Sequence, residues 1–175
     1  MDSNSSQSEE LYRAAVGESK AGYYLPLFYR FDQGGSRVSW NWPALFVPLF
    51  WMIYRRMYGP AAIYFFAYPF ALVILLGIVI AVLGEAAGAL VYWLAIIVVR
   101  VLIAMFANSL YHWHVRKRVD KLAAHAPSHE ALVQRIIGQS SGSAPVVVAI
   151  VIVGSVFFIG ILAAIAIPAY QDYTI

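Results

Sequence analysis

The chain has 175 residues, of which 62% are hydrophobic and 12% carry a charge, and its formal net charge is +3. Soluble domains are about 45–50% apolar and about 25% charged, so this composition excludes a large water-facing domain and indicates an integral membrane protein. The sequence contains no cysteine, which excludes disulfides, thiolate metal sites and cysteine nucleophiles.

The amino-terminal residues 1–39 are predicted to form a cytosolic arm. Residues 1–10 are rich in serine and acidic side chains, so we expect them to be disordered, and they lack the basic and apolar regions of a secretory signal. Residues 11–37 are aromatic and basic without a clear period, and Pro26 interrupts them. We predict an irregular segment lying on lipid headgroups, where tyrosine is favoured; a binding surface for a partner is the alternative.

Residues 43–58 form a short apolar segment. Asn41 can cap a helix whose first turn contains Pro43, and Pro48 weakens that helix because its ring displaces a hydrogen bond. The apolar part spans only about 18 Å as a helix, too short for a hydrocarbon core of about 30 Å. We predict an interfacial or re-entrant helix; a strongly tilted span is the alternative. Its interface side chains would be Trp40, Trp42, Trp51, Tyr54 and Tyr58, with Arg55 and Arg56 reaching lipid phosphates.

Two long apolar segments, residues 60–83 and 89–111, follow. The first contains no charged side chain and the second contains only Arg100. Each is long enough to cross a hydrocarbon core of about 30 Å, and a backbone in lipid must satisfy its own hydrogen bonds. Both are therefore predicted transmembrane helices, joined into an antiparallel hairpin by a turn over residues 84–88.

Arg100 lies near the middle of the second span. A charge there costs at least about 2.5–3.5 kcal/mol, so Arg100 should face protein or water. Pro69 frees the carbonyl of Phe65, and we predict that Arg100 donates to this carbonyl or to Tyr68 in a structural role. An anion or proton path is the alternative. The predicted intramembrane polar residues are Tyr64, Tyr68, Arg100 and Asn108.

Basic side chains gather at the open end of this hairpin, whereas the turn carries only Glu85. The positive-inside rule then places the open end and the amino terminus in the cytoplasm. Anionic lipids attract such side chains. The predicted headgroup contacts of this part are Trp113, Arg116, Lys117, Arg118 and Lys121.

After the hairpin, we expect the helix to continue to residue 124 and to end before Pro127. Ser128 can cap a short amphipathic helix over residues 129–137, closed by Gly138. A linker completes the cytosolic segment 125–145. Residues 146–168 are predicted to form a third transmembrane helix, followed by an external tail over residues 169–175. Its predicted packing residues are Gly160, Ala163, Ala164 and Ile167.

The four histidines do not form a convincing metal site. His112 and His114 project from different faces of a helix, and Pro127 interrupts the spacing of His125 and His129. No nucleotide-binding, nucleophile-elbow or metalloprotease motif occurs. We therefore expect no enzymatic activity, no cofactor, no metal and no nucleic-acid partner.

Two stretches resemble a widespread bacterial family of small membrane proteins of unknown function. They read WNWPALF (residues 40–46) and PLFWMIYRRMY (residues 48–58). Asn108, Tyr111 and His112 also match the end of that family's last helix, which basic residues follow. The resemblance covers residues 23–120 and implies a protein of the cytoplasmic membrane without an established activity.

The sequence GILAAIAIPAYQDYT (residues 160–174) resembles the stem helix of type IV pilins. Prepilins carry a glycine at their cleavage site and a glutamate shortly after it, but this chain has Val146 and Val151 at those positions. The resemblance therefore implies neither cleavage by prepilin peptidase nor polymerisation as a normal subunit. It implies a helix that could dock among pilin helices and that runs outward from the cytoplasm.

We predict an all-α integral membrane protein with three transmembrane helices and a short interfacial or re-entrant helix. It would lie in the bacterial cytoplasmic membrane, with a cytoplasmic amino terminus and a periplasmic carboxyl terminus. Its expected function is structural or accessory, through helix–helix contacts. The alternatives are an accessory component of a type IV pilus or type II secretion machinery, and a small transporter or channel subunit. Expected partners are a bilayer with anionic headgroups, pilin or pilus-platform proteins, or a second copy of the chain.

Overall fold

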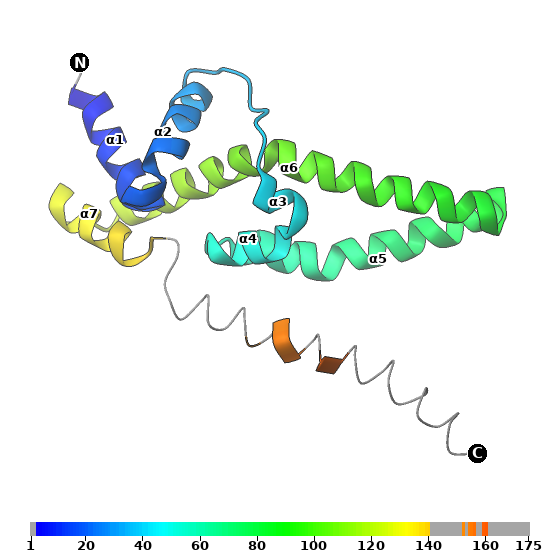
Figure 1. Ribbon diagram of the computed structural model, residues 1–175. Coiled ribbons are helices and arrows are strands. Elements are labelled where there is room, and N and C mark those ends of the chain that lie inside the picture. Colours follow the sequence, from blue (N-terminus) through cyan, green and yellow to red (C-terminus); the bar gives the residue numbers. More distant parts are fainter. Residues whose placement is uncertain (1–2, 141–151, 153, 157–158, 161–175) are drawn as a thin grey trace. The chain divides into compact units, whose positions relative to one another are not determined.

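The computed structural model describes residues 3–140, 152, 154–156 and 159–160. The chain divides into two units, Met1–Ser141 and Gly142–Ile175. All regular elements of the described residues are α-helices, which confirms the predicted all-α class. The helices of the first unit are α1 (Ser3–Val16), α2 (Glu18–Asp32), α3 (Trp42–Phe46), α4 (Pro48–Tyr54), α5 (Tyr58–Leu83), α6 (Glu85–Ala123) and α7 (His129–Gly138) (Figure 1).

In the second unit, the described residues 152, 154–156 and 159–160 are helical, and Gly160 is exposed. Most of the predicted third transmembrane helix, residues 146–168, lies outside the described residues. The predicted packing residues Ala163, Ala164 and Ile167 also lie outside them. These assignments stay predictions.

The antiparallel hairpin is formed by α5 and α6, which lie side by side along their length (Figure 1). Only Gly84, with a φ of 79° that suits glycine, separates the two helices. The prediction of a turn over residues 84–88 was therefore too long. Gly88 instead belongs to α6 and packs on α5, because a Cβ atom there would lie 2.8 Å from Ile80 Cγ1 and 3.1 Å from Ile80 Cα.

Residues 43–58 form two short helices rather than one. Asn41 caps α3 as predicted, since its side-chain oxygen accepts a hydrogen bond from the Ala44 amide at 3.0 Å. The break falls at Val47, where φ is −132° and ψ is 59°, because the residue before a proline avoids helical angles. The helix α3 packs on α6, and α4 packs on α5.

A group of helices that we call the cap surrounds the carboxyl-terminal part of α6, and it consists of α1, α2 and α7 (Figure 1). The core between the cap and α6 contains the fully buried side chains of Phe28, Tyr111 and Ile136. The predicted disorder of residues 1–10 and the predicted irregular structure of residues 11–37 were wrong, since helices cover most of both.

The helix α2 forms because its buried side chains recur at helical spacing, at Ala21, Tyr24, Leu25, Phe28 and Phe31. Pro26 has no backbone N–H group that could donate a hydrogen bond to the carbonyl of Gly22. Gly22 is exposed, so solvent can reach that carbonyl. The predicted continuation of α6 beyond the hairpin and the helix α7 are confirmed, and Ser128 caps α7 by accepting from the Ala131 amide at 3.2 Å.

Candidate functional site

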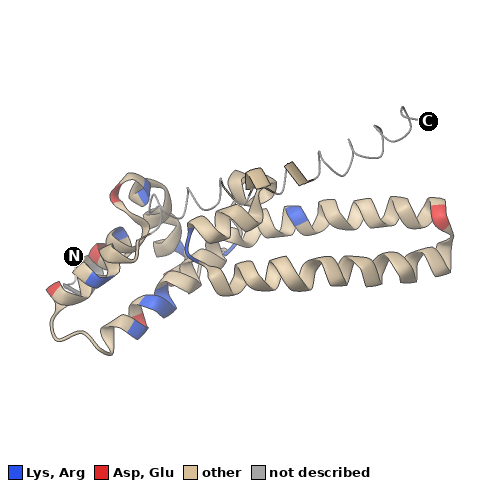
Figure 2. Cartoon of the chain, turned by 90° about the horizontal axis from the view of Figure 1, so that it is seen from below, with Lys and Arg blue, Asp and Glu red and all other residues tan. Residues whose placement is uncertain are grey.

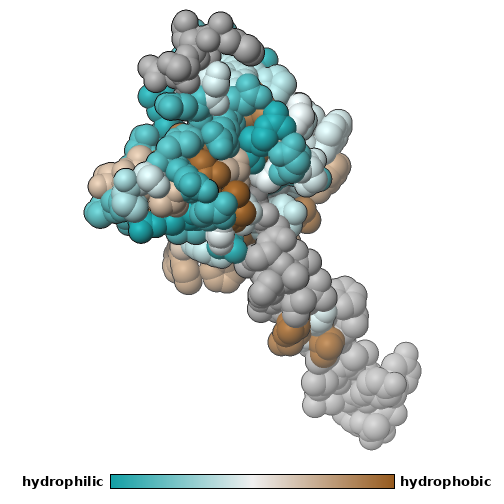
Figure 3. Space-filling model, turned by 90° about the vertical axis from the view of Figure 1, so that its left-hand side faces the viewer, coloured by the Kyte–Doolittle hydropathy of each residue, from teal (hydrophilic) through white to brown (hydrophobic). Residues whose placement is uncertain are grey.

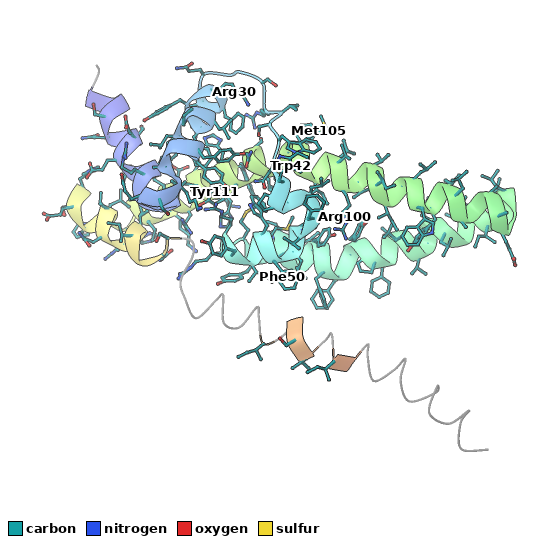
Figure 4. All side chains as sticks on the ribbon, viewed as in Figure 1. Arg30, Trp42, Phe50, Arg100, Met105 and Tyr111 are labelled. Carbon is teal, nitrogen blue, oxygen red and sulfur yellow. The ribbon has the colours of Figure 1, made fainter. Side chains whose placement is uncertain are left out.

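One face of α6 carries the buried polar side chains of Asn108 and His112. Asn108, Tyr111 and His112 are buried on successive turns of this helix, and Arg100 lies two turns before Asn108. Asn108, Tyr111 and His112 each contact α2, through Tyr23, Tyr24 and Asp32, whereas Arg100 contacts α3. Figure 4 shows Arg100 and Tyr111 on this helix, with α3 beside Arg100. The face therefore joins the hairpin to the cap.

Asn108 is the centre of a closed hydrogen-bond network, the Asn108 cluster, which comprises Tyr23, Ser39, Asn41 and Asn108. The fully buried Asn108 accepts from Asn41 Nδ2 at 2.7 Å and donates to Tyr23 Oη at 2.9 Å and to Ser39 Oγ at 3.0 Å. Tyr23 in turn donates to the Trp40 carbonyl at 2.8 Å. Every polar atom of the Asn108 side chain is engaged, which is the condition for a buried polar network to be stabilising.

The backbone of the same segment is fixed on α6 as well. The amides of Ser39 and Asn41 donate to the carbonyls of Met105 and Ala104 at 2.9 and 3.1 Å. Together with the Asn108 cluster, these bonds bring the two parts of the sequence motif, residues 40–46 and 108–112, into direct contact. The motif is thus a single structural unit in space.

Arg55 is buried between aromatic rings. Its guanidinium carbon lies 4.6 Å from the centre of the Tyr24 ring and 5.0 Å from that of Tyr111, and its Nη2 donates to Tyr24 Oη at 3.0 Å. Cation–π contacts of this kind strengthen when water is removed from them. Burial raises the pKa of Tyr24, so its hydroxyl keeps its proton. The prediction that Arg55 reaches lipid phosphates was wrong, because Arg55 is only 5% exposed.

A second polar cluster joins α1 and α2 to α6. Asp32 accepts from Tyr12 Oη at 2.8 Å, lies 3.0 Å from His112 Nε2, and pairs with Arg116 Nη1 at 3.4 Å. Burial lowers the pKa of His112 below its usual value, and the nearby Asp32 carboxylate only partly opposes this shift. A neutral imidazole protonated at Nε2 satisfies the contact with Asp32. Burial and Asp32 together raise the pKa of Tyr12.

Arg100 contacts α3 and not the partners predicted for it. Its Nη1 donates to the Phe46 carbonyl at 2.9 Å and to the Leu45 carbonyl at 3.4 Å. These carbonyls belong to the end of α3, where helical hydrogen bonds run out. The predicted structural role agrees with this geometry, but the predicted acceptors, Tyr68 and the Phe65 carbonyl, were wrong. Tyr64 and Tyr68 stack on each other with their ring centres 4.9 Å apart.

The remaining predicted interface residues fall into two groups. Trp40, Trp42 and Trp113 are exposed, with 40%, 60% and 50% of their surface accessible, whereas Trp51 is buried and its prediction was wrong. Arg116 pairs with Asp32. The other basic side chains that were predicted to contact headgroups at this end of the hairpin line a pocket of about 380 Å³, which we call the basic pocket. Its lining residues are Arg56, Tyr58, His114, Lys117, Arg118, Lys121 and Gln139.

Sequence reasoning did not find Tyr12, Tyr23 and Asp32 as site residues. They lie in the segment that was predicted to be irregular, and their partners on α6 follow at least 80 positions later. The helical spacing of the buried residues of α2 is the signal that could have found this part. Among the described residues, no group of three or more His, Asp or Glu side chains could hold a metal ion.

Residues 13–117 match the model of a protein family, described as a protein of unknown function (DUF2628). The matched range contains the Asn108 cluster, Arg55, Arg100 and His112, and it ends inside the basic pocket, before Arg118. No curated protein and no solved structure matches the chain. The match agrees with the predicted resemblance to a family of unknown function.

Proposed function

We propose that this chain, which belongs to the DUF2628 family of proteins of unknown function, is a non-catalytic membrane protein that acts through helix contacts. In this proposal α5 and α6 span the bilayer of a bacterial cytoplasmic membrane, and the cap lies on the cytoplasmic side. The interfacial segment α3–α4 lies between them. The membrane-spanning parts are residues 60–83 and 89–111.

The observation that carries the proposal is the exposure of the hairpin. Two helices are long and apolar enough to cross a membrane, and 0% of the most apolar part of α5 and 6% of that of α6 are buried. Large side chains such as Ile63, Phe70 and Val82 are each more than two-thirds exposed, at 69%, 70% and 74%. A core helix of a soluble protein would be mostly buried, and a patch of this size needs lipid or protein to cover it.

The charge distribution supports the orientation. Figure 2 shows that charged residues of the first unit gather on the cap side, whereas the hairpin carries Arg100 along its length and Glu85 at its turn. Figure 3 shows that the end formed by α1 and α7 is covered mainly by hydrophilic residues. The excess of Lys and Arg at the open end of the hairpin favours a cytoplasmic cap.

Cysteine labelling tests this topology directly, because the natural chain contains no cysteine. Single variants Glu85→Cys, Lys20→Cys and Lys121→Cys are expressed in bacterial cells and treated with a membrane-impermeant maleimide. We expect labelling of Glu85→Cys in intact cells, and labelling of the other two only after permeabilisation. The cysteine-free chain is the control for background labelling. Extraction of the protein by alkaline carbonate, or equal labelling of all three variants in intact cells, would contradict the proposal.

The contacts of Arg100 support a structural role over a transport path, because its guanidinium is held by backbone carbonyls of α3. A role beside pilins remains a prediction from the sequence of residues 160–174.

A further inference from the structure

The basic pocket lies at the open end of the hairpin, where α5 begins and α6 continues into the cap. Arg56 and Tyr58 come from the junction of α4 and α5, whereas His114, Lys117, Arg118 and Lys121 come from α6. No described acidic side chain lines the pocket. The local charge is therefore entirely positive among the described residues that form it.

The two arginines of the pocket are incompletely satisfied. Arg118 Nη1 donates to the Gln139 carbonyl at 3.0 Å, but its Nε and Nη2 are buried without a hydrogen-bond partner. Arg56 Nε is also buried without a hydrogen-bond partner. Burial lowers the pKa of Arg118, and the nearby charge of Arg56 acts in the same direction. Partly buried guanidinium groups that lack acceptors are costly, and an anion between them would remove this cost.

The backbone also holds Arg56 in an unusual conformation. Its φ is 56°, and no other non-glycine residue among those described has a positive φ. Its amide donates to the Ile53 carbonyl at 2.9 Å, which fixes the turn. Positive φ costs free energy in a residue with a side chain, and such strain tends to occur where a side chain must be aimed at a ligand.

We infer that the basic pocket binds a phosphate group, and that its source is the headgroup of an anionic phospholipid. Arginine and lysine donors are suited to phosphate oxygens, and Tyr58 adds a hydroxyl at the rim. The lipid source rests on the proposed function, because the pocket lies where α5 and α6 would leave the membrane. Trp113, with Lys117 Nζ 5.0 Å from the centre of its ring, lies at the same level of α6.

The test uses the full-length protein in neutral detergent, titrated with short-chain phosphatidylglycerol, short-chain phosphatidylcholine and inorganic phosphate while bound ligand is counted by native mass spectrometry. The pocket variant is Lys117→Gln/Lys121→Gln, and the matched control is Lys20→Gln/Arg37→Gln. All four side chains are exposed, so both variants lose two charges without disturbing the core. A hydrogen bond to a charged group contributes about tenfold or more in affinity, so the pocket variant should bind phosphatidylglycerol at least about 10-fold more weakly.

The inference is supported if phosphatidylglycerol binds more tightly than phosphatidylcholine and if only the pocket variant loses this preference. Binding of inorganic phosphate that depends on the pocket, without a preference among lipids, would support the phosphate site and assign it to a soluble source. Unchanged binding of both anions by the pocket variant would overturn the inference. The phosphate titration does not need a membrane, so the site can stand even if the topology experiment contradicts a membrane-spanning hairpin.

Discussion

Asn108 shows how much of this fold depends on a single amide. Its fully buried side chain joins residues of α2, of the extended segment before α3, and of α6 in one hydrogen-bond network. Loss of Asn41 would leave Asn108 Oδ1 without its donor, and loss of Asn108 would leave Asn41 Nδ2 without its acceptor. The cost of such a loss exceeds the net gain of an ordinary hydrogen bond, because the remaining group has already been desolvated.

We predict that Asn41→Ala and Asn108→Ala each lower the free energy of unfolding by about 1–3 kcal/mol, because each leaves its partner unsatisfied. The double variant should lose less than the sum, with a coupling energy of about 0.5–3 kcal/mol. Denaturant unfolding in detergent, followed by circular dichroism, measures these values. The control pair is Asn108→Ala with Ser128→Ala, the cap of α7, for which the losses should add. Additive losses for Asn41 and Asn108 would contradict the role of the cluster.

Arg55 and Trp51 mark the limit of sequence reasoning at this scale. A polar or aromatic side chain next to an apolar segment is normally expected at the membrane interface, and Trp40, Trp42 and Trp113 are indeed exposed. Arg55 instead meets Tyr24 and Tyr111, which lie 31 and 56 positions away in the chain. Local patterns do not contain the information about which distant aromatic residues lie opposite an arginine. The cap on α3 was predictable because Asn41 and Ala44 are near neighbours.

At the scale of elements, the hairpin depends on close contact near its turn. A Cβ atom at Gly88 would lie 3.1 Å from the Cα atom of Ile80, whereas a Cβ atom at Gly77, also on the hairpin, would meet nothing within 4 Å. Small residues let two helices approach in this way where no large side chain could fit.

We predict that Gly88→Ala destabilises the hairpin by about 1–3 kcal/mol, because the added methyl group must displace the Ile80 backbone. Gly77→Ala is the matched control, and it should be neutral or stabilising by up to about 1 kcal/mol, because alanine favours helix. Unfolding of the purified protein in mixed detergent micelles measures both variants. Equal effects of the two substitutions would show that contact at Gly88 does not hold the helices together.

The helices themselves were predictable to different degrees. The start of α7 follows from Ser128, and its end from Gly138, so local signals were sufficient. The same is true of the long apolar helices α5 and α6. The helix α2 was not predicted, because its tyrosines and Pro26 interrupt the helical spacing of apolar residues in the sequence. The helical spacing is clear only once the buried residues are known. The break at Val47 follows from Pro48, but the sequence did not indicate that the two short helices would pack on different partners.

At the scale of the whole first unit, the Asp32–His112 contact links the cap to α6. His112 faces Asp32 from α2, Tyr12 from α1 and Arg116 from its own helix, and the charge of Arg37 also acts on it. Since burial lowers the folded-state pKa of His112 below its unfolded value of about 6.5, the unfolded chain takes up the proton first as pH falls. The contribution of His112 to stability is therefore fully present above the pKa of the unfolded state. It decreases as the pH falls from that value towards the lower pKa of the folded state.

We predict that the free energy of unfolding decreases between about pH 7.5 and pH 5, and that His112→Gln reduces this dependence. Part of the pH dependence should remain in this variant, because burial and the charge of Arg118 also lower the pKa of His114. His125→Gln is the control, since His125 is exposed. Chemical unfolding at a series of pH values provides the measurement. An unchanged pH slope in His112→Gln would show that this histidine does not govern docking of the cap.

The long separation between contacting segments has a consequence for synthesis. Tyr12 and His112 are 100 positions apart, and at about 5–20 residues per second the ribosome makes the second about 5–20 s after the first. During this interval the apolar faces of α1 and α2 have no α6 to cover them. We therefore expect a chaperone or the targeting machinery to cover these faces of the nascent chain until α6 has been made and the amino-terminal helices can pack on it.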